Sequence, residues 1–332
     1  MSPQHLTPTQ QQMKEWIRYA TLAPSGHNTQ PWKFSIHENR ITIYPDYRKR
    51  LPMVDPDDHA LFISLGCALE NLIIAAKHFG YQPRIVHDLN EQESEAIHVD
   101  LIKRNESSGN TLFRAIPTRQ ATRSTYDGKP IPEKDLEALR DASAQEGVRF
   151  KIFTDPADLE RLTELVKQGN RLQFNNKAFV NELISWIRFN KSAAKRTRDG
   201  LYGASMGAPS VPRWLGQLFI KLASAEKEAQ KCEKAIQSSA ALMLFIAENN
   251  DKQSWIHVGR SFERVALAAA QRHIRHAHLN MPCEEPSLRE ELQHYLGLQN
   301  EQPLLLLRIG YAAPMPDSFR KPVEDVLINY KR

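Results

Sequence analysis

The fold of this 332-residue chain is decided by a short stretch that occurs twice, as GCALENLIIAA at 66–76 and GRSFERVALAA at 259–269. The copies match at one constant offset, and their glycine, glutamate and paired alanines coincide. Both lie in predicted long helices, 57–79 and 253–278, the first apolar on nearly all sides and therefore buried. The surrounding order of helix, strand, buried helix and strand also repeats. We therefore predict an α+β layered fold built from two copies of one unit.

Composition is that of a globular protein, with 41% hydrophobic and 25% charged residues. The longest apolar runs are too short to span a bilayer, and the N-terminus lacks a basic-then-apolar signal pattern. The three cysteines are widely separated, which argues against a disulfide framework or a zinc site. Three histidines at 273, 276 and 278 have no carboxylate or cysteine at a metal-binding spacing. These features predict a cytoplasmic protein without a metal.

The positive charge is modest and locally concentrated. The net charge is +5, and the dense basic stretch covers 188–198. No recognition helix or aromatic stacking pattern accompanies that stretch, so we interpret it as a solvated loop. We expect neither a nucleic acid nor a membrane as a partner. The surplus charge is compatible with an anionic cofactor.

The loop PSGHNTQPW at 24–32 has two interpretations. Pro24 ends the first helix, and Pro31 is expected to force Gln30 into an extended conformation that launches a strand with Trp32 buried. In one interpretation the loop is only a connector. In the other, the Asn28 amide, a hydroxyl and backbone N–H groups face a planar heteroaromatic ring.

Two basic segments and one long irregular segment also have alternatives. Arg119-x-x-x-Arg123 and the run 318–322 fit either a phosphate clamp or solvated surface. After a predicted amphipathic helix at 170–189, the segment 191–215 is rich in Gly, Pro, Ser and Arg and lacks regular periodicity. Such a segment is either a lid or a flexible insertion.

Taken together, PSxxNxQPW, Arg119-x-x-x-Arg123 and the C-terminal Arg320-Lys321-Pro322 resemble the flavin-binding segments of the FMN-dependent nitroreductase superfamily. The tandem arrangement with an interrupting loop is most similar to the Acg-type branch, in which two nitroreductase-like units are fused. The resemblance implies a nitroreductase-like pseudo-dimer. Residues 1–110 would donate the flavin loop, and residues 111–332 would carry the phosphate-binding arginines and a lid-like insertion at 191–215.

The same resemblance implies one FMN between the halves, because each half supplies only part of a site. The arginines would hold the phosphate and ribityl chain, the loop residues would contact the isoalloxazine, and a lysine would lie near its pyrimidine edge. A serine usual in the family is replaced by Ala121. No catalytic side chain is implied. The implied cofactor-binding residues are Pro24, Ser25, Asn28, Arg119, Arg123, Lys234 and Arg320.

The function implied by the resemblance is an FMN-dependent oxidoreductase. Hydride would pass from NAD(P)H through FMN to a nitroaromatic, a quinone or a similar small-molecule acceptor. The alternative is an FMN-binding or storage protein with a lid-covered site and little turnover. In either case we expect a monomer or a weak homodimer.

Overall fold

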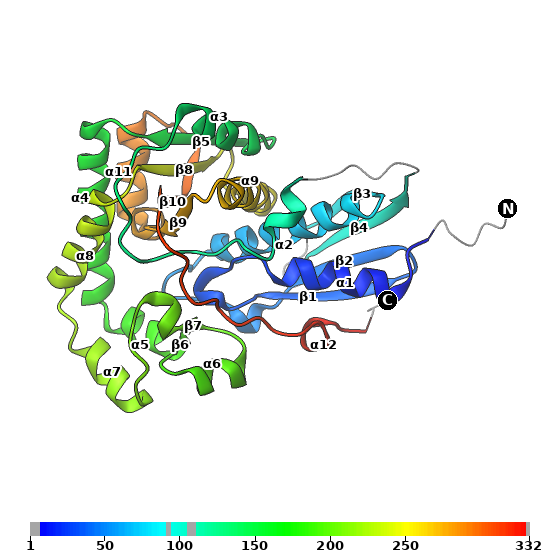
Figure 1. Ribbon diagram of the computed structural model, residues 1–332, viewed down its shortest axis with the longest axis horizontal. Coiled ribbons are helices and arrows are strands. Elements are labelled where there is room, and N and C mark those ends of the chain that lie inside the picture. Colours follow the sequence, from blue (N-terminus) through cyan, green and yellow to red (C-terminus); the bar gives the residue numbers. More distant parts are fainter. Residues whose placement is uncertain (1–6, 91–93, 105–110, 330–332) are drawn as a thin grey trace.

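The structure is a computed structural model that describes residues 7–90, 94–104 and 111–329 (Figure 1). Its first half contains a four-stranded antiparallel sheet in the order β1-β2-β4-β3. The hairpin between β1 and β2 turns at Glu38, which has a φ of 51°. The elements of this half are α1 (Gln10–Thr21), η2 (Gly26–Asn28), β1 (Trp32–His37), β2 (Arg40–Pro45), η3 (Tyr47–Lys49), α2 (His59–His78), β3 (Tyr81–Asp88) and β4 (Ala96–Lys103).

The second half contains a second four-stranded antiparallel sheet, in the order β5-β8-β10-β9. Its central strands β8 and β10 are almost entirely buried. Its elements up to the insertion are η4 (Thr111–Ala115), α3 (Glu133–Ala142), β5 (Val148–Phe153), α4 (Pro156–Asn175) and α5 (Lys177–Trp186). Those after the insertion are α8 (Ala225–Gln237), β8 (Ala241–Ala247), α9 (Lys252–Gln271), β9 (Arg275–His278), α10 (Met281–Glu284), α11 (Pro286–Leu296), β10 (Gln302–Gly310) and α12 (Val323–Val326).

The two halves meet where the buried helices α2 and α9 cross between the sheets (Figure 1). A Cβ atom on Gly66 would lie 2.1 Å from the backbone oxygen of Ile256, and one on Gly259 would lie 2.0 Å from that of Ile63. These two contacts are equivalent under the offset of the sequence repeat. The predicted α+β fold with two copies is thereby confirmed, and the repeated glycines are explained by the close approach of the two backbones.

Helix α2 has the length and composition of a membrane-crossing helix, but 94% of its most apolar window is buried inside the fold. It packs with Trp16, Trp32 and Phe262 in one apolar core that extends across both halves. Its apolarity is therefore accounted for by the crossing with α9.

The insertion is more regular than its sequence predicts. The predicted helix 170–189 is two helices, because the backbone breaks at Asn176, whose side chain accepts hydrogen bonds from the first turn of α5. The segment expected to be irregular, 191–215, and the residues on either side of it form short elements, stabilised by caps and by a parallel pairing of β6 with β7. These elements are β6 (Ile187–Arg188), α6 (Lys191–Thr197), β7 (Leu201–Tyr202), η5 (Gly203–Met206) and α7 (Arg213–Lys221).

The predicted helix 253–278 is also wrong at its end. Helix α9 ends at Gln271, His273 has a φ of 58°, and 275–278 form strand β9 against β10. The apolar spacing typical of a helix continues through residues 275–278, which form a strand. A strand of four residues is too short for its own two-residue period to be recognised.

The C-terminal segment returns from the second sheet to the first. It runs from β10 past the insertion, and Leu327 forms a bridge with Phe34 of β1 (Figure 1). The boundary predicted between 110 and 111 lies at residues 105–110, outside the described residues, so the limits 1–110 and 111–332 stay predictions.

Candidate functional site

The loop between α1 and β1 has an unusual backbone. His27, Asn28 and Gln30 all have positive φ values, of 47°, 54° and 54°. The expectation that Pro31 holds Gln30 extended is therefore wrong. The Gln30 side chain donates to the Arg198 carbonyl at 2.8 Å and accepts from the Lys321 N–H at 2.9 Å, and these contacts hold the disfavoured conformation. Strain held in place by tertiary contacts is typical of functional loops.

Asn28 joins three segments that are far apart in the sequence. Its side-chain N–H groups donate to the carbonyls of Gly200, at 3.0 Å, and Phe319, at 3.1 Å. Its amide oxygen accepts from Arg320 Nη1 at 2.8 Å. The Gly200 N–H also donates to the Asn28 carbonyl. The amide thus fixes the loop, the insertion and the C-terminal segment to one another, and both of its N–H groups are already used.

The three segments enclose a cavity of about 230 Å³, here named the arginine cavity. The segment 116–123, which carries Arg119 and Arg123, also lines the cavity. It runs beside β9, where Ala121 forms a bridge with His276. The insertion contributes Leu201 and Ser205 to the wall. Six of the seven predicted cofactor-binding residues line this cavity, namely Pro24, Ser25, Asn28, Arg119, Arg123 and Arg320.

The arginine cavity carries more positive than negative charge. Arg119 Nε lies 3.3 Å from a carboxyl oxygen of Glu263, and both side chains are buried. Burial raises the pKa of Glu263 to about 7, against the opposing effect of Arg119. Enclosure by the protein, followed by the charge of Arg119, lowers the pKa of Arg320 to about 9. The side chain of Arg123 forms no hydrogen bond or ion pair within the described residues.

Several buried polar atoms in this cluster make no hydrogen bond, although Arg119 and Glu263 form an ion pair. Nε of Arg119, Nε of Arg320 and both carboxyl oxygens of Glu263 are buried without a hydrogen bond. Three guanidinium groups therefore line a cavity that has one carboxyl group in its wall, Asp317, and one buried behind Arg119, Glu263. A phosphate in that space would accept charge-assisted hydrogen bonds and offset the buried positive charge. The residues present fit the phosphate of FMN.

A second cavity, of about 250 Å³, adjoins the first and is here named the ring cavity. Pro24, Ser25, Arg123, Leu201 and His278 line both cavities, so the two cavities are direct neighbours. The walls of the ring cavity are mainly apolar and include Ile63, Phe179, Leu183, Phe262, Met281 and Leu305. Such walls suit a planar ring system.

The ring cavity also contains a carboxyl group that the sequence analysis missed. Glu284 accepts from Gln173 Nε2 at 2.7 Å and from Asn280 Nδ2 at 3.4 Å. Burial raises the pKa of Glu284. Cys67 lines the same cavity, and burial raises the pKa of its thiol well above the ordinary value, so it is not a reactive thiolate. Glu284 lies in the four-residue helix α10, which has no sequence signal.

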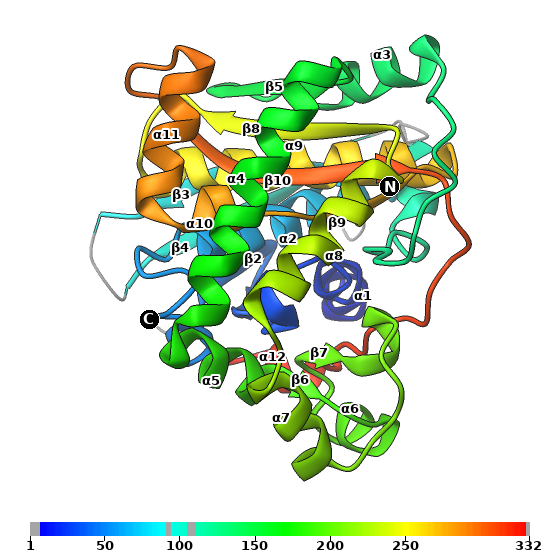
Figure 2. The same ribbon diagram turned by 90° about the vertical axis from the view of Figure 1, so that its left-hand side faces the viewer.

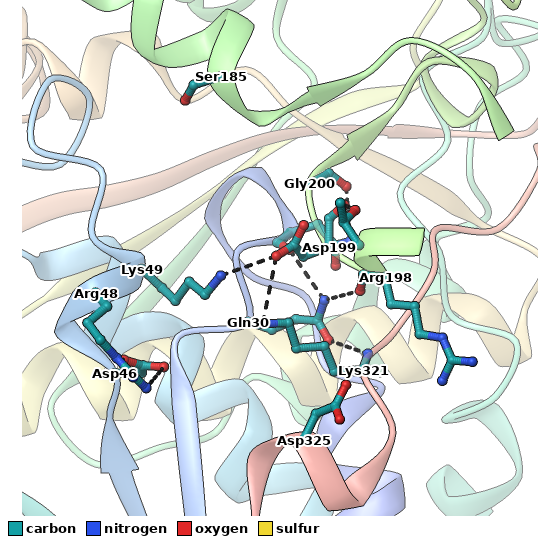
Figure 3. A network of polar contacts seen from close by, with 12 residues as sticks. Gln30, Asp46, Arg48, Lys49, Ser185, Arg198, Asp199, Gly200, Lys321 and Asp325 are labelled. Carbon is teal, nitrogen blue, oxygen red and sulfur yellow. Dashed lines mark hydrogen bonds and ion pairs between the residues drawn. The ribbon is translucent and has the colours of Figure 1, made fainter. Parts of the chain in front are cut away.

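The insertion is held over the site by Asp199 (Figure 3). This buried carboxylate is 2.7 Å from Arg188 Nη2, 3.2 Å from Lys49 Nζ and 3.7 Å from Lys321 Nζ. The arginine and lysine groups hold the pKa of Asp199 below its usual range despite its burial. Lys49 and Lys321 connect the insertion to the first half and to the C-terminal segment, respectively. The Asn28–Gly200 pair also connects the insertion to the first half.

The histidines lie differently from the expectation. His276 and His278 are in strand β9, and His278 lines both cavities. Burial, followed by the charges of Arg123 and Arg119, lowers the pKa of His278 to about 3, so the ring is neutral at pH 7. Among the described residues, the one group with metal-binding spacing is Asp55, Asp57 and His59, which does not include these histidines.

Lys234 does not join the site. It is exposed in the last turn of α8, and it lines neither cavity. Helix α8 packs on α4 through Ala229 and Ile236, which leaves the lysine on its solvent side.

The chain is similar along nearly its whole length to proteins of Mycobacterium tuberculosis. It is 22% identical to "Putative NAD(P)H nitroreductase Rv3131", over 96% of this chain and 92% of that protein. It is also 22% identical to "Putative NAD(P)H nitroreductase acg", over 95% of this chain and 94% of that protein. No protein-family profile matches the chain. These similarities confirm the predicted resemblance to the nitroreductase superfamily and its Acg-type branch.

Among solved structures, the chain is similar to the FMN-dependent nitroreductase NfnB from Mycobacterium smegmatis in complex with NADPH. That likeness has a TM-score of 0.41 and 16% identity, over 60% of this chain and 86% of that one. A nitroreductase with bound FMN from Bacteroides fragilis gives a TM-score of 0.37 and 19% identity, over 61% of this chain and 89% of that one.

Proposed function

We propose that this protein is an FMN-dependent oxidoreductase that takes hydride from NAD(P)H and passes it to a nitroaromatic, a quinone or a similar acceptor. The observation that carries the proposal is the direct adjacency of the arginine cavity and the ring cavity, which share five lining residues. The first has three guanidinium groups and the second has apolar walls, which matches the phosphate and the ring of one flavin mononucleotide. The names of the full-length relatives support the same activity.

Each residue of the site has a role in this proposal. Arg119, Arg123 and Arg320 bind the phosphate, and Pro24 and Ser25 contact the ring. Asn28 is a positioning residue, because its side chain is used by Arg320, Gly200 and Phe319. FMN, when bound, supplies the redox chemistry. No described side chain is required as a general acid, and water supplies the proton to the reduced acceptor.

The wall around the ring controls water and access. Leu201 of the insertion and Phe262 of α9 line the ring cavity and exclude water. Neutral His278 offers a hydrogen bond without adding charge beside the ring. Glu284, held by Gln173 and Asn280, is a polar group in the otherwise mainly apolar wall. Lys234 is omitted from the proposed site because it lines neither cavity.

The activity is tested by the visible spectrum of the purified protein under anaerobic conditions. We expect an oxidised flavin spectrum with one FMN per chain, which bleaches on addition of NADPH or NADH and recovers when a nitroaromatic or a quinone is added. A flavin that neither donor reduces would refute the oxidoreductase proposal.

Binding is tested separately with Arg123→Ala. This arginine has no protein partner that its loss would leave unpaired, so the variant should fold normally. It should bind FMN about 1.5–3 kcal/mol more weakly, the range for a hydrogen bond to a charged group. Arg114→Ala, an exposed arginine outside both cavities, is the matched control. Equal FMN affinity in the two variants would refute the phosphate assignment.

The firm attachment of the insertion supports a second candidate function, that of an FMN-binding or storage protein. The insertion is fixed over the site by the two-way Asn28–Gly200 pairing and by three cations around Asp199. A cover held this firmly suits retention of FMN with little turnover. Tight FMN binding without reduction of any acceptor would favour it, whereas rapid turnover would exclude it. Both candidates agree with a cytoplasmic chain that works as a monomer or weak homodimer.

A further inference from the structure

The insertion exposes an apolar surface that the proposed function does not use. Helix α7 presents Trp214, Leu218, Phe219 and the following Leu222, with side chains 69%, 46%, 59% and 72% exposed. Trp214, Leu218 and Leu222 are four residues apart in succession, so they form one stripe. We name these four residues the α7 apolar surface. A helix stripe of tryptophan, phenylalanine and leucine exposed to this degree marks an interaction site.

Helix α7 is fixed with this stripe outward. Gly216 is buried on the opposite side, where an added Cβ would lie 2.1 Å from a ring carbon of Phe189. Just before the helix, the Val211 N–H donates to the Phe189 carbonyl at 3.1 Å. The Asn190 side chain caps α6 and also donates to the Val211 carbonyl at 3.4 Å. Helices α6 and α7 therefore belong to one lobe, which lies at the lower end of the molecule in both views (Figure 2).

This lobe carries a large excess of positive charge. Between 187 and 224 the chain has seven cationic residues and one acidic residue, Asp199, which is buried and paired with Arg188. This excess is larger than the +5 of the whole chain, so the rest of the protein contributes no net positive charge. The other six cations are exposed and, in the part of the chain that the structure describes, form no ion pair. They are Lys191, Lys195, Arg196, Arg198, Arg213 and Lys221.

We propose that this lobe binds the surface of an anionic membrane, with the α7 apolar surface inserted at the headgroup level and the six cations contacting lipid phosphates. Helix α7 has aromatic and leucine side chains flanked by Arg213 and Lys221 and contains no acidic residue, and these are the features of an interfacial helix. The nearest acids that follow, Glu226 and Glu228, are paired with Arg171 and Lys231. A folded protein partner would need acidic side chains opposite these cations and a matching apolar groove, whereas an anionic bilayer offers both properties over any area.

This proposal departs from the expectation that no membrane is a partner. That expectation followed from the absence of a spanning segment, and interfacial binding needs none. The proposal does not depend on FMN or on turnover. The proposal brings the insertion close to the lipid surface, because α6, β7 and α7 all belong to it. The same insertion contributes Leu201 and Ser205 to the wall of the arginine cavity.

The test is sedimentation of the full-length protein with lipid vesicles. We expect binding to phosphatidylcholine vesicles containing about 30% phosphatidylglycerol, weak binding to phosphatidylcholine alone, and loss of binding at about 0.5 M salt. Trp214→Ser/Leu222→Ser and Lys195→Glu/Arg196→Glu should each lower the partition coefficient at least about tenfold. Matched controls are Val86→Ser/Ile102→Ser, at exposed apolar residues of the first sheet, and Arg114→Glu/Lys134→Glu, at exposed cations elsewhere. The controls should bind as the parent does.

Several results would overturn the proposal. Absent or salt-independent binding to anionic vesicles would do so, as would equal losses in the variants and their controls. Self-association abolished by Trp214→Ser/Leu222→Ser, without vesicle binding, would identify a second copy of the chain as the occupant. A nucleic acid shift abolished by Lys195→Glu/Arg196→Glu, without vesicle binding, would identify the lobe as a nucleic acid surface. The unfolding midpoint of each variant, measured in parallel, separates lost binding from lost folding.

Discussion

The buried pair of Arg119 and Glu263 makes a quantitative prediction about pH. Replacing Arg119 with alanine removes the cation 3.3 Å from a carboxyl group that has no exposed surface. The pKa of Glu263 in the folded protein is about 7, above the value of roughly 4.3 expected in the unfolded chain. The folded state therefore binds more protons between these values, and stability falls as the pH rises through that window.

Without Arg119, the pKa of Glu263 rises further, so the fall in stability continues above pH 7. Below pH 7 the carboxyl group is largely neutral in both proteins. There the variant loses mainly packing and the hydrogen bond from Arg119 Nη2 to the Leu22 carbonyl. Above pH 7 the difference in unfolding free energy between parent and variant should grow by about 1.4 kcal/mol per pH unit.

The assay is urea unfolding of the FMN-free proteins, followed by tryptophan fluorescence between about pH 6 and pH 9. In Arg119→Ala/Glu263→Gln the group that titrates is gone, so the growth above pH 7 should disappear. A difference between parent and Arg119→Ala that is the same at every pH would refute the assignment of a buried, Arg119-dependent carboxyl group.

Three further predictions address the helix crossing, the cover and the histidine. Gly66→Ala and Gly259→Ala should each lower the unfolding free energy by about 3 kcal/mol or more, because the added methyl meets backbone atoms; Gly203→Ala, whose nearest neighbour is at 3.6 Å, should be nearly neutral in the same urea titration. Asp199→Ala should release FMN about tenfold faster in a stopped-flow measurement, because three cations lose their shared anchor, and an unchanged rate would mean that the insertion does not retain the cofactor. His278 has a folded pKa of about 3, so the unfolded chain binds the extra proton and stability falls as the pH drops below about 6.5. His278→Gln should make that fall shallower by up to about 1.4 kcal/mol per pH unit, and an unaltered slope would contradict the burial of a neutral ring.

Several features of the protein were determined by the sequence alone. The repeated glycine, glutamate and alanines predicted two related units with buried helices. Small residues recur at these positions because two helices that pack closely leave no room for larger side chains between their backbones. The residue types of the loop at 24–32 and of the arginines at 119 and 123 left both a ligand site and a structural role open, and their resemblance to the flavin-binding segments of nitroreductases implied a flavin site. The structure brings every predicted cofactor-binding residue except Lys234 to one cavity.

Other features were decided by tertiary structure. The positive φ of Gln30 opposes the local preference set by Pro31 and is held by contacts with Arg198 and Lys321. Strand β9 and helix α10 are each four residues long, so no periodicity reveals them, yet they place His278 and Glu284 in the site. The order of the insertion depends on partners distant in the chain, as Asp199 with Lys49 shows.

The loop at 24–32 illustrates the division. Its residue types left a connector and a ligand site both open, and Asn28 reaches Gly200, Phe319 and Arg320 only through the tertiary fold. Contacts across such long sequence separations leave no spacing in the sequence. The chemistry of the site was therefore local information, and its assembly was not.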